Sequence, residues 1–246
     1  MFGTCSCFDQ HHVQPRVQGV RFHAERQDTS AQGWLHLLEL IDEAAADGRE
    51  SFDPLSEMSR EERRQVRTLP PSVGKLTAVK YLGLPASNLV RLPAEIGAMA
   101  SLEVFDPYMS HKLHWFPYEL TRCKNLRSST VSTRSVFGNF KYRPPFPALG
   151  QRALPPGGLD PGVWGADMVS SCSVCDGPFT EWGVRQAWLS ARVATDVLPL
   201  LVNACSDACV EALPEGADRH LRAPHSGGPG IAQPGAREGF RRLGAG

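Results

Sequence analysis

Three stretches of the chain repeat one pattern of apolar and proline residues at a nearly constant interval, which constrains the fold more than any other feature. Residues 69–79, 92–102 and 116–126 each begin with a large apolar residue followed by proline, and carry apolar residues at their fifth, eighth and eleventh positions. They begin 23 and then 24 residues apart. Such a period is typical of a stack of similar units, because one unit alone cannot bury its apolar face.

Each unit is expected to hold one short strand followed by a turn. Residues 79–84 alternate between apolar and other residues, so every second side chain should point into the core. Residues 102–105 and 126–131 occupy the same place in the next two units, with a weaker alternation in the last. Ser87 and Ser110 fall at equivalent turn positions, where a hydroxyl group can bond the backbone of a neighbouring unit.

The pattern Leu-Pro-x-x-Ile-Gly-x-Leu-x-x-Leu resembles the intracellular leucine-rich repeats of the Ras-binding group. The resemblance covers residues 69–131, and it implies an α/β fold, a short leucine-rich repeat solenoid whose strands line a concave binding face. Together with the cysteine-containing segment described below, the repeats also resemble a set of uncharacterised bacterial leucine-rich repeat proteins. The resemblance implies a scaffold that binds a protein partner, and it does not name the partner.

The concave face implied by this resemblance gives the candidate partner-binding residues. They lie at outward positions of the strands or in the following turn: Tyr81, Val104, Asp106, Tyr108 and His111. Aromatic side chains with a polar tip favour interfaces. Trp115 and Phe116 are close by, but we expect both to pack between units.

Residues 31–67 predict helices that cover the first end of the stack. Apolar residues between positions 34 and 45 fall at helical spacing, Gly48 is a stop signal, and Ser59 with Glu62 forms a capping box. A stack of repeats needs such a cover for its open end. We divide the chain into a disordered N-terminus (1–30), a helical cap (31–67), leucine-rich repeats (68–142), a Pro/Gly-rich linker (143–168), a small α+β zinc-finger-like subdomain (169–214) and a disordered tail (215–246).

Four of the seven cysteines fall in two close pairs, Cys172 with Cys175 and Cys205 with Cys209. A Cys-x-x-Cys turn can direct both sulfur atoms at one tetrahedral ion. In the second pair, Ser206 is a good N-cap, so Cys209 would lie in the first turn of a helix. We therefore predict that the four cysteines are the ligands of a closed, structural Zn²⁺ site.

The segment that carries these pairs resembles a treble-clef zinc finger. Residues 182–193 and 197–202 predict strands, which gives the order knuckle, hairpin and helix. The second pair departs from the usual spacing by one residue. Unmetallated or redox-active thiols are the main alternative, and disulfides are a further one. Cys5 and Cys7, with His11 and His12, are expected to be incidental residues of a disordered N-terminus. Cys123 is expected to be a small core residue.

Composition and motifs argue against several classes of function. Lys plus Arg equals Asp plus Glu at 26 each, which gives no general attraction to nucleic acid or to an anionic membrane. Without an apolar run typical of a membrane helix or signal peptide, we expect a cytoplasmic protein. No phosphate-binding loop, Gly-x-Ser-x-Gly elbow or His-Glu-x-x-His motif is present, so we expect no enzyme. The alternatives are nucleic-acid binding through the cysteine segment, with Arg185, Arg192 and the tail arginines, or a redox-responsive thiol switch.

Overall fold

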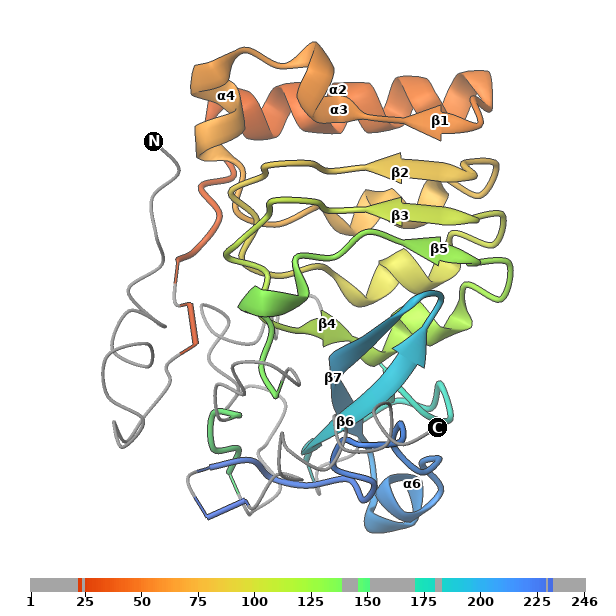
Figure 1. Ribbon diagram of the computed structural model, residues 1–246. Helices are drawn as coiled ribbons and strands as arrows, with labels where there is room; N and C mark the ends of the chain where they lie inside the picture. The colour runs from red at the N-terminus through yellow and green to blue at the C-terminus, as the bar shows by residue number, and fades with distance from the viewer. Residues whose placement is uncertain are drawn as a thin grey trace, which may run out of the picture.

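The fold combines helices with two sheets, as predicted for an α/β protein (Figure 1). The computed structural model describes residues 22–23, 25–138, 146–150, 171–179, 183–228 and 230–231. The predicted linker (143–168) therefore lies almost entirely outside the described residues, as do Cys5, Cys7, His11 and His12. The first sheet is parallel and its strands are ordered β1 (Ser51–Phe52), β2 (Tyr81–Gly83), β3 (Val104–Asp106) and β5 (Ser128–Ser129).

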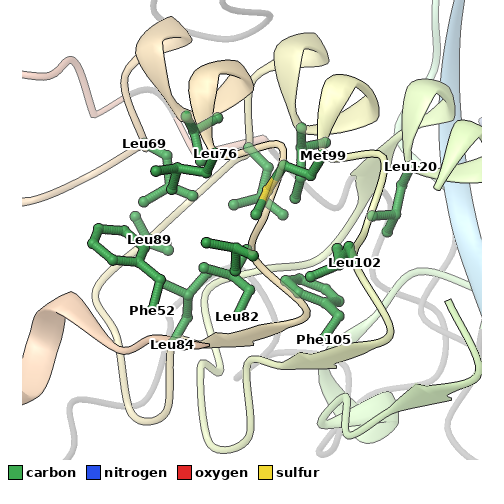
Figure 2. Packing of buried hydrophobic residues seen from close by; sticks show 14 of the residues in the cluster. Phe52, Leu69, Leu76, Leu82, Leu84, Leu89, Met99, Leu102, Phe105 and Leu120 are labelled. Atoms are coloured by element: carbon green, nitrogen blue, oxygen red, sulfur yellow. The ribbon is translucent and has the colours of Figure 1, made fainter. Parts of the chain in front are cut away.

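Successive units lie in register behind this sheet. Each carries a short 3-10 helix that begins just after the proline at the second position of the repeat: η1 (Pro71–Lys75), η2 (Ala94–Ala98) and η3 (Tyr118–Arg122). The core lies between the strands and these helices, and Figure 2 shows the side chains of Leu82 and Phe105 pointing from the strands toward Leu76 and Met99. All four are fully or almost fully buried. The apolar positions of the repeat pattern therefore face one continuous core.

The turns after the strands are linked by serine hydroxyl groups, as the sequence predicts. Ser87 Oγ donates to Ser110 Oγ at 2.7 Å, and Ser110 Oγ donates to the carbonyl oxygen of Leu84 at 2.8 Å. In the next turn, the backbone N–H of Met109 donates to Ser132 Oγ at 2.9 Å. These bonds satisfy buried backbone groups and connect neighbouring units.

Three helices lie at the first end of the stack, beside β1 (Figure 1). Helix α2 (Gln32–Asp47) buries an apolar stripe against the first unit and ends at Gly48, which has a positive φ of 68°. Helix α3 spans Pro54–Glu57, and α4 spans Arg60–Gln65. The predicted capping box at Ser59 is present. Gly33 allows α2 to approach α4, since an added Cβ would come within 2.4 Å of the Glu62 carbonyl oxygen.

A long hairpin lies at the other end of the stack (Figure 1). Strands β6 (Arg185–Val193) and β7 (Asp196–Ala204) are antiparallel, and β7 also pairs in parallel with β4 (Phe116–Pro117) of the third unit. Leu198 and Leu200 belong to the same core as the repeat units. The hairpin is therefore packed directly onto the stack.

The turn of this hairpin covers the edge of the first sheet. Thr195 Oγ1 donates to the carbonyl oxygen of Ser129 at 2.8 Å, and the Asp196 carboxylate accepts from Ser129 Oγ at 2.9 Å. The same carboxylate accepts from the N–H of Val131 at 3.3 Å. These contacts occupy polar groups of β5 that an open sheet edge would expose to other chains.

Parts of both predicted disordered ends are packed in this structure. Phe22 stacks on Trp188 with ring centroids 5.8 Å apart. Toward the other end, the backbone of Trp188 and that of His225 exchange two hydrogen bonds of 2.8 and 3.1 Å. Trp188 is fully buried, so aromatic burial accounts for the order of these segments. Among the described residues, no helix is long and apolar enough to cross a membrane.

Candidate metal centre

The four predicted ligand cysteines converge on one point. Their sulfur atoms all lie within 4.8 Å of one another. Cys205 Sγ is 3.6 Å from Cys175 Sγ and 3.6 Å from Cys209 Sγ. Four thiolates bound to Zn²⁺ at about 2.3 Å in a tetrahedron would have sulfur atoms about 3.8 Å apart. The cluster is thus a possible metal site, and its donor set fits zinc.

The first cysteine pair is held in a tight turn. The N–H of Cys172 donates to the carbonyl oxygen of Gly177 at 2.8 Å, and Asp176 adopts a positive φ of 60°. A Cβ on Gly177 would lie 3.3 Å from the sulfur of Cys175, so the glycine permits a close approach. The turn therefore presents both sulfur atoms on the same side.

Backbone N–H groups stabilise the buried sulfur of Cys172. Its Sγ accepts from the N–H of Val174 at 3.4 Å and from that of Cys205 at 3.3 Å. Burial opposes ionisation of this thiol, but the hydrogen bonds from Cys175, Val174 and Cys205 outweigh it and lower the pKa of Cys172 to about 7. The thiolate, which is the form that binds metal, is thus accessible near neutral pH.

The second pair is positioned by the end of β7 and by α6 (Asp207–Glu211). Ser206 is the N-cap, as predicted, and its Oγ accepts from the N–H of Cys209 at 3.2 Å. Burial, followed by the neighbouring thiols, raises the pKa of Cys205 to about 12. Crowding four sulfur atoms therefore disfavours several thiolates at once unless a cation compensates their charge.

Third-unit residues fix the knuckle against the stack. Arg122 Nη2 on η3 donates to the carbonyl oxygen of Ser173 at 2.8 Å and lies 2.6 Å from the Asp176 carboxylate. Ser173 also pairs with β7, since its N–H donates to the Asn203 carbonyl oxygen at 2.8 Å. Glu119, also on η3, is buried beside this turn, and burial raises the pKa of its carboxyl group despite a hydrogen bond from Ser173. Sequence reasoning did not find these anchors, because no local pattern links residues about 50 positions apart.

The candidate partner-binding residues lie on the outer surface of the first sheet and in its next turn. Tyr81 and Val104 are register partners on β2 and β3, and both are partly exposed. The Tyr81 hydroxyl group donates to the Asp106 carboxylate at 3.3 Å. Tyr108 is 52% exposed, and His111 is exposed with Nδ1 3.2 Å from Ser135 Oγ. The five side chains thus lie along adjoining strand and turn positions.

Two other expectations concern core residues. Trp115 is buried, and its ring packs against that of Trp188 at a centroid distance of 6.2 Å. Phe116 is fully buried. Cys123 is buried in the third unit, and burial raises its pKa to about 11. All three are core residues, as predicted, and Cys123 is a buried thiol that does not belong to the cysteine cluster.

A charged row flanks the outer sheet surface. Glu50, Lys80, Glu103 and Arg127 precede β1, β2, β3 and β5 respectively, so their signs alternate across the sheet. Lys80 pairs with Glu50 at 2.5 Å, and Arg127 pairs with Glu103 at 2.5 Å. The row therefore carries little net charge, and the apolar area of this surface comes from Tyr81, Val104 and Tyr108.

No protein-family model matches the chain, and no curated protein matches its sequence.

Proposed function

We propose that this protein is a leucine-rich repeat scaffold that binds a protein partner through the outer face of its parallel sheet. The observation that carries the proposal is the adjoining placement of Tyr81, Val104 and Asp106, which are partly exposed on strands whose other side chains form the core. A tyrosine, a branched apolar residue and a carboxylate offer both apolar area and a directional polar contact. No catalytic role is assigned.

We also propose that the four cysteines hold a structural Zn²⁺ ion in a zinc-finger-like segment of the scaffold. Four thiolate ligands close the coordination sphere, so the ion would supply stability and no reactive position. The ion would join the knuckle at Cys172 to the helix at Cys209. Cysteines that serve as metal ligands are typical of reducing compartments, which supports a cytoplasmic location.

Two of the arginines expected for nucleic-acid binding are already paired within the chain. Arg185 forms an ion pair with Asp207, and Arg222 pairs with Glu215 and Asp218. Such pairing reduces the positive charge that phosphate groups would contact. It favours a protein partner over nucleic acid.

The binding proposal is tested by affinity capture followed by mass spectrometry with the full chain. The double variant Tyr81→Ala, Asp106→Ala is compared with Lys124→Ala, which alters an exposed residue just beyond η3 on the opposite side of the core. We expect the wild type and Lys124→Ala to capture the same protein, and the double variant to lose it. Equal capture by all three would refute the proposed face.

The metal proposal is tested by elemental analysis of freshly purified, reduced protein. We expect about one zinc per chain in the wild type and in Cys123→Ala, and little in Cys175→Ser. A metal-free wild type that forms a Cys175–Cys205 disulfide once the reductant is removed would instead support the thiol-switch alternative.

A further inference from the structure

A segment near the N-terminus crosses the turns of the repeat units. Gln27 binds the backbone at the end of α4 through both atoms of its amide group. Its Nε2 donates to the Gln65 carbonyl oxygen at 3.1 Å, and its Oε1 accepts from the Arg67 N–H at 2.7 Å. Further along the stack, the carbonyl oxygen of Glu25 accepts from Arg91 Nη2 at 3.0 Å. We call residues 22–23 and 25–28 the strap.

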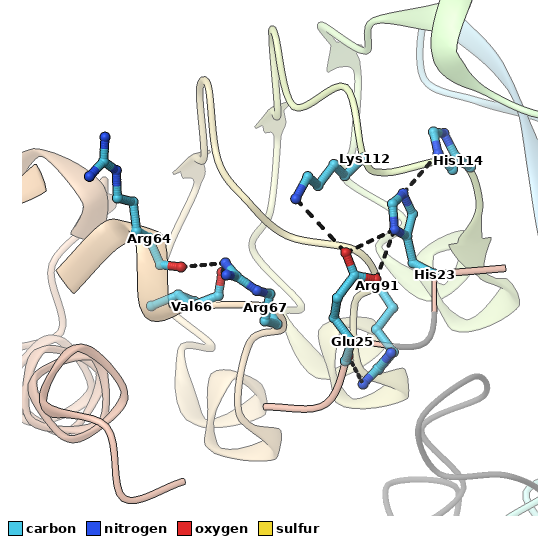
Figure 3. Close-up of polar contacts among 8 residues, drawn as sticks. All are labelled: His23, Glu25, Arg64, Val66, Arg67, Arg91, Lys112 and His114. Carbon is cyan, nitrogen blue, oxygen red and sulfur yellow. Dashed lines mark hydrogen bonds and ion pairs between the residues drawn. The ribbon is translucent and has the colours of Figure 1, made fainter. Parts of the chain in front are cut away.

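The strap meets the third unit through two histidine rings that face each other (Figure 3). His23 Nε2 lies 3.1 Å from His114 Nε2. Their ring centroids are 5.0 Å apart, so the rings approach through their Nε2 edges. His114 is 1% exposed and the His23 side chain is 9% exposed. Water therefore has little access to mediate this contact.

The other nitrogen of each ring is committed as a donor. His114 Nδ1 lies 2.6 Å from the carbonyl oxygen of Ser135, which can only accept, so Nδ1 carries a proton. His23 Nδ1 lies 2.8 Å from a carboxylate oxygen of Glu25. Burial raises the pKa of Glu25, but hydrogen bonds from its own backbone and from His23, with the charges of His23 and Lys112, bring it below its usual value. Glu25 is therefore ionised near neutral pH, and His23 Nδ1 also donates.

These assignments leave three protonation states for the facing Nε2 atoms. With no proton, two lone pairs would meet at hydrogen-bond distance, and with two protons, two N–H groups would meet. Only one proton gives an N–H···N hydrogen bond. We infer that His23 and His114 share a single proton, and that this bound proton clasps the strap onto the repeat units.

Some charged groups around the histidine pair favour binding of the shared proton, and others oppose it. The Glu25 carboxylate lies on the strap and favours the added positive charge. Lys112 Nζ lies 3.9 Å from that carboxylate, and Arg91 contacts the Glu25 carbonyl oxygen, so two cations of the repeat units oppose the charge. Phe137, with its ring 5.5 Å from that of His114, contributes apolar cover. Among the described residues, one carboxylate and the N–H···N bond itself thus hold the single positive charge.

The consequence is a clasp that depends on pH. The strap is held best where the pair carries one proton. It loosens as pH rises and that proton is lost, since two neutral rings then oppose their lone pairs. Loosening of the strap would also free Phe22 from its place on Trp188. An ordinary exposed histidine, with a pKa of about 6.5, would not couple its protonation to the attachment of the strap.

The proton itself is tested in the wild-type, full-length protein by ¹⁵N NMR of its imidazole nitrogens at pH 7. Assignment would use His23→Gln and His114→Gln. We expect both Nδ1 atoms to be protonated and one proton to be shared by the two Nε2 atoms. Two neutral rings, two fully charged rings or a zinc ion bound between the rings would each overturn the inference.

The clasp is tested by hydrogen–deuterium exchange of residues 22–28 between pH 6.5 and 8.5, corrected for intrinsic exchange rates. His114→Gln is the informative variant, because its amide N–H can donate to neutral His23 without a shared proton. His220→Gln is the matched control, since His220 Nδ1 lies 3.2 Å from the carbonyl oxygen of Asp218, outside the strap and the groups that contact it. We expect protection to fall several-fold with rising pH in the wild type and in His220→Gln, and to stay constant in His114→Gln. The same pH response in all three would overturn the clasp.

Discussion

Arg122 of the third repeat unit reaches across to Asp176 in the cysteine knuckle, with Nη2 2.6 Å from the carboxylate, while the same nitrogen donates to Ser173. The candidate metal site is thereby attached to the stack by side chains as well as by the β4–β7 pairing. A change at the knuckle should therefore alter the packing of the third unit, and a change at the third unit should alter the affinity for metal.

Arg122→Ala is expected to weaken zinc binding about tenfold, the lower end of the range for partners that orient metal ligands. The ion pair itself is largely exposed, so its electrostatic contribution is small. Competition with a chromophoric chelator would measure the affinity. Arg127→Ala, which removes an arginine paired with Glu103 on the sheet, is the matched control and should retain wild-type affinity. Equal affinities in both variants would contradict the anchoring role.

Removal of zinc by a chelator is expected to loosen the two cysteine segments and to leave the hairpin in place. Residues 171–179 and 205–213 contain the ligands and few strand bonds, whereas β6 and β7 pair along nine residues each and contribute Leu198 and Leu200 to the core. Hydrogen exchange should therefore rise in the first two segments and change little in the strands. Uniform loss of protection in β7 would show that the metal supports the whole hairpin.

Several local features of the fold could be predicted because short-range patterns determine them. The repeat placed Leu76 and Met99 at one position of the core, and both are buried. Ser59 and Ser206 were identified as N-caps from the residues that follow them, and both side chains accept the expected backbone N–H bond. The spacing of the cysteines was enough to predict that Cys172 lies near Cys209.

The relations that could not be predicted join distant segments through single contacts. Phe116 pairs with Leu200 across 84 residues, and a run of apolar residues in β7 does not specify which strand it meets. Arg122 has the appearance of an ordinary surface arginine until the knuckle is placed beside it. The same holds for His23, which lies in a polar stretch that lacks periodicity. Phe22 in that stretch packs on Trp188 of the hairpin, a contact between segments far apart in the sequence.

Asp196→Ala is expected to destabilise the protein by about 1–2 kcal/mol, because Ser129 and Val131 lose an acceptor at the end of the stack. Exposure of the β5 edge should also promote self-association. Urea unfolding would measure the first effect, and sedimentation velocity the second. Asp218→Ala, at a carboxylate side chain that is 91% exposed, is the control. A monomeric Asp196→Ala protein of wild-type stability would argue against this role for the hairpin turn.

The ring of His225 makes the free energy of unfolding of the protein depend on pH in the acid range. Its Nδ1 accepts from the N–H of Gly227 at 3.1 Å, its ring centroid lies 4.6 Å from that of Phe146, and Nε2 has no hydrogen-bond partner among the described residues. Burial lowers the pKa of His225 to about 4. In the unfolded chain this histidine has a pKa of about 6.5, so the unfolded state binds more protons than the folded state between pH 4 and pH 6.5. The contribution of His225 to stability is therefore complete above pH 6.5 and falls as pH decreases toward 4.

His225→Asn should remove this component, because an amide oxygen can replace Nδ1 as the acceptor from Gly227 and does not titrate. We expect the wild type to lose roughly 2 kcal/mol more than the variant between pH 7 and pH 4, a figure reduced for the partial exposure of the ring. Urea unfolding at several pH values would measure the difference. His36→Asn, at a histidine whose Nδ1 lies 3.1 Å from a Glu62 oxygen on the outside of the helical end, is the control. Parallel pH profiles for the wild type and His225→Asn would show that this ring is not the origin of the acid sensitivity.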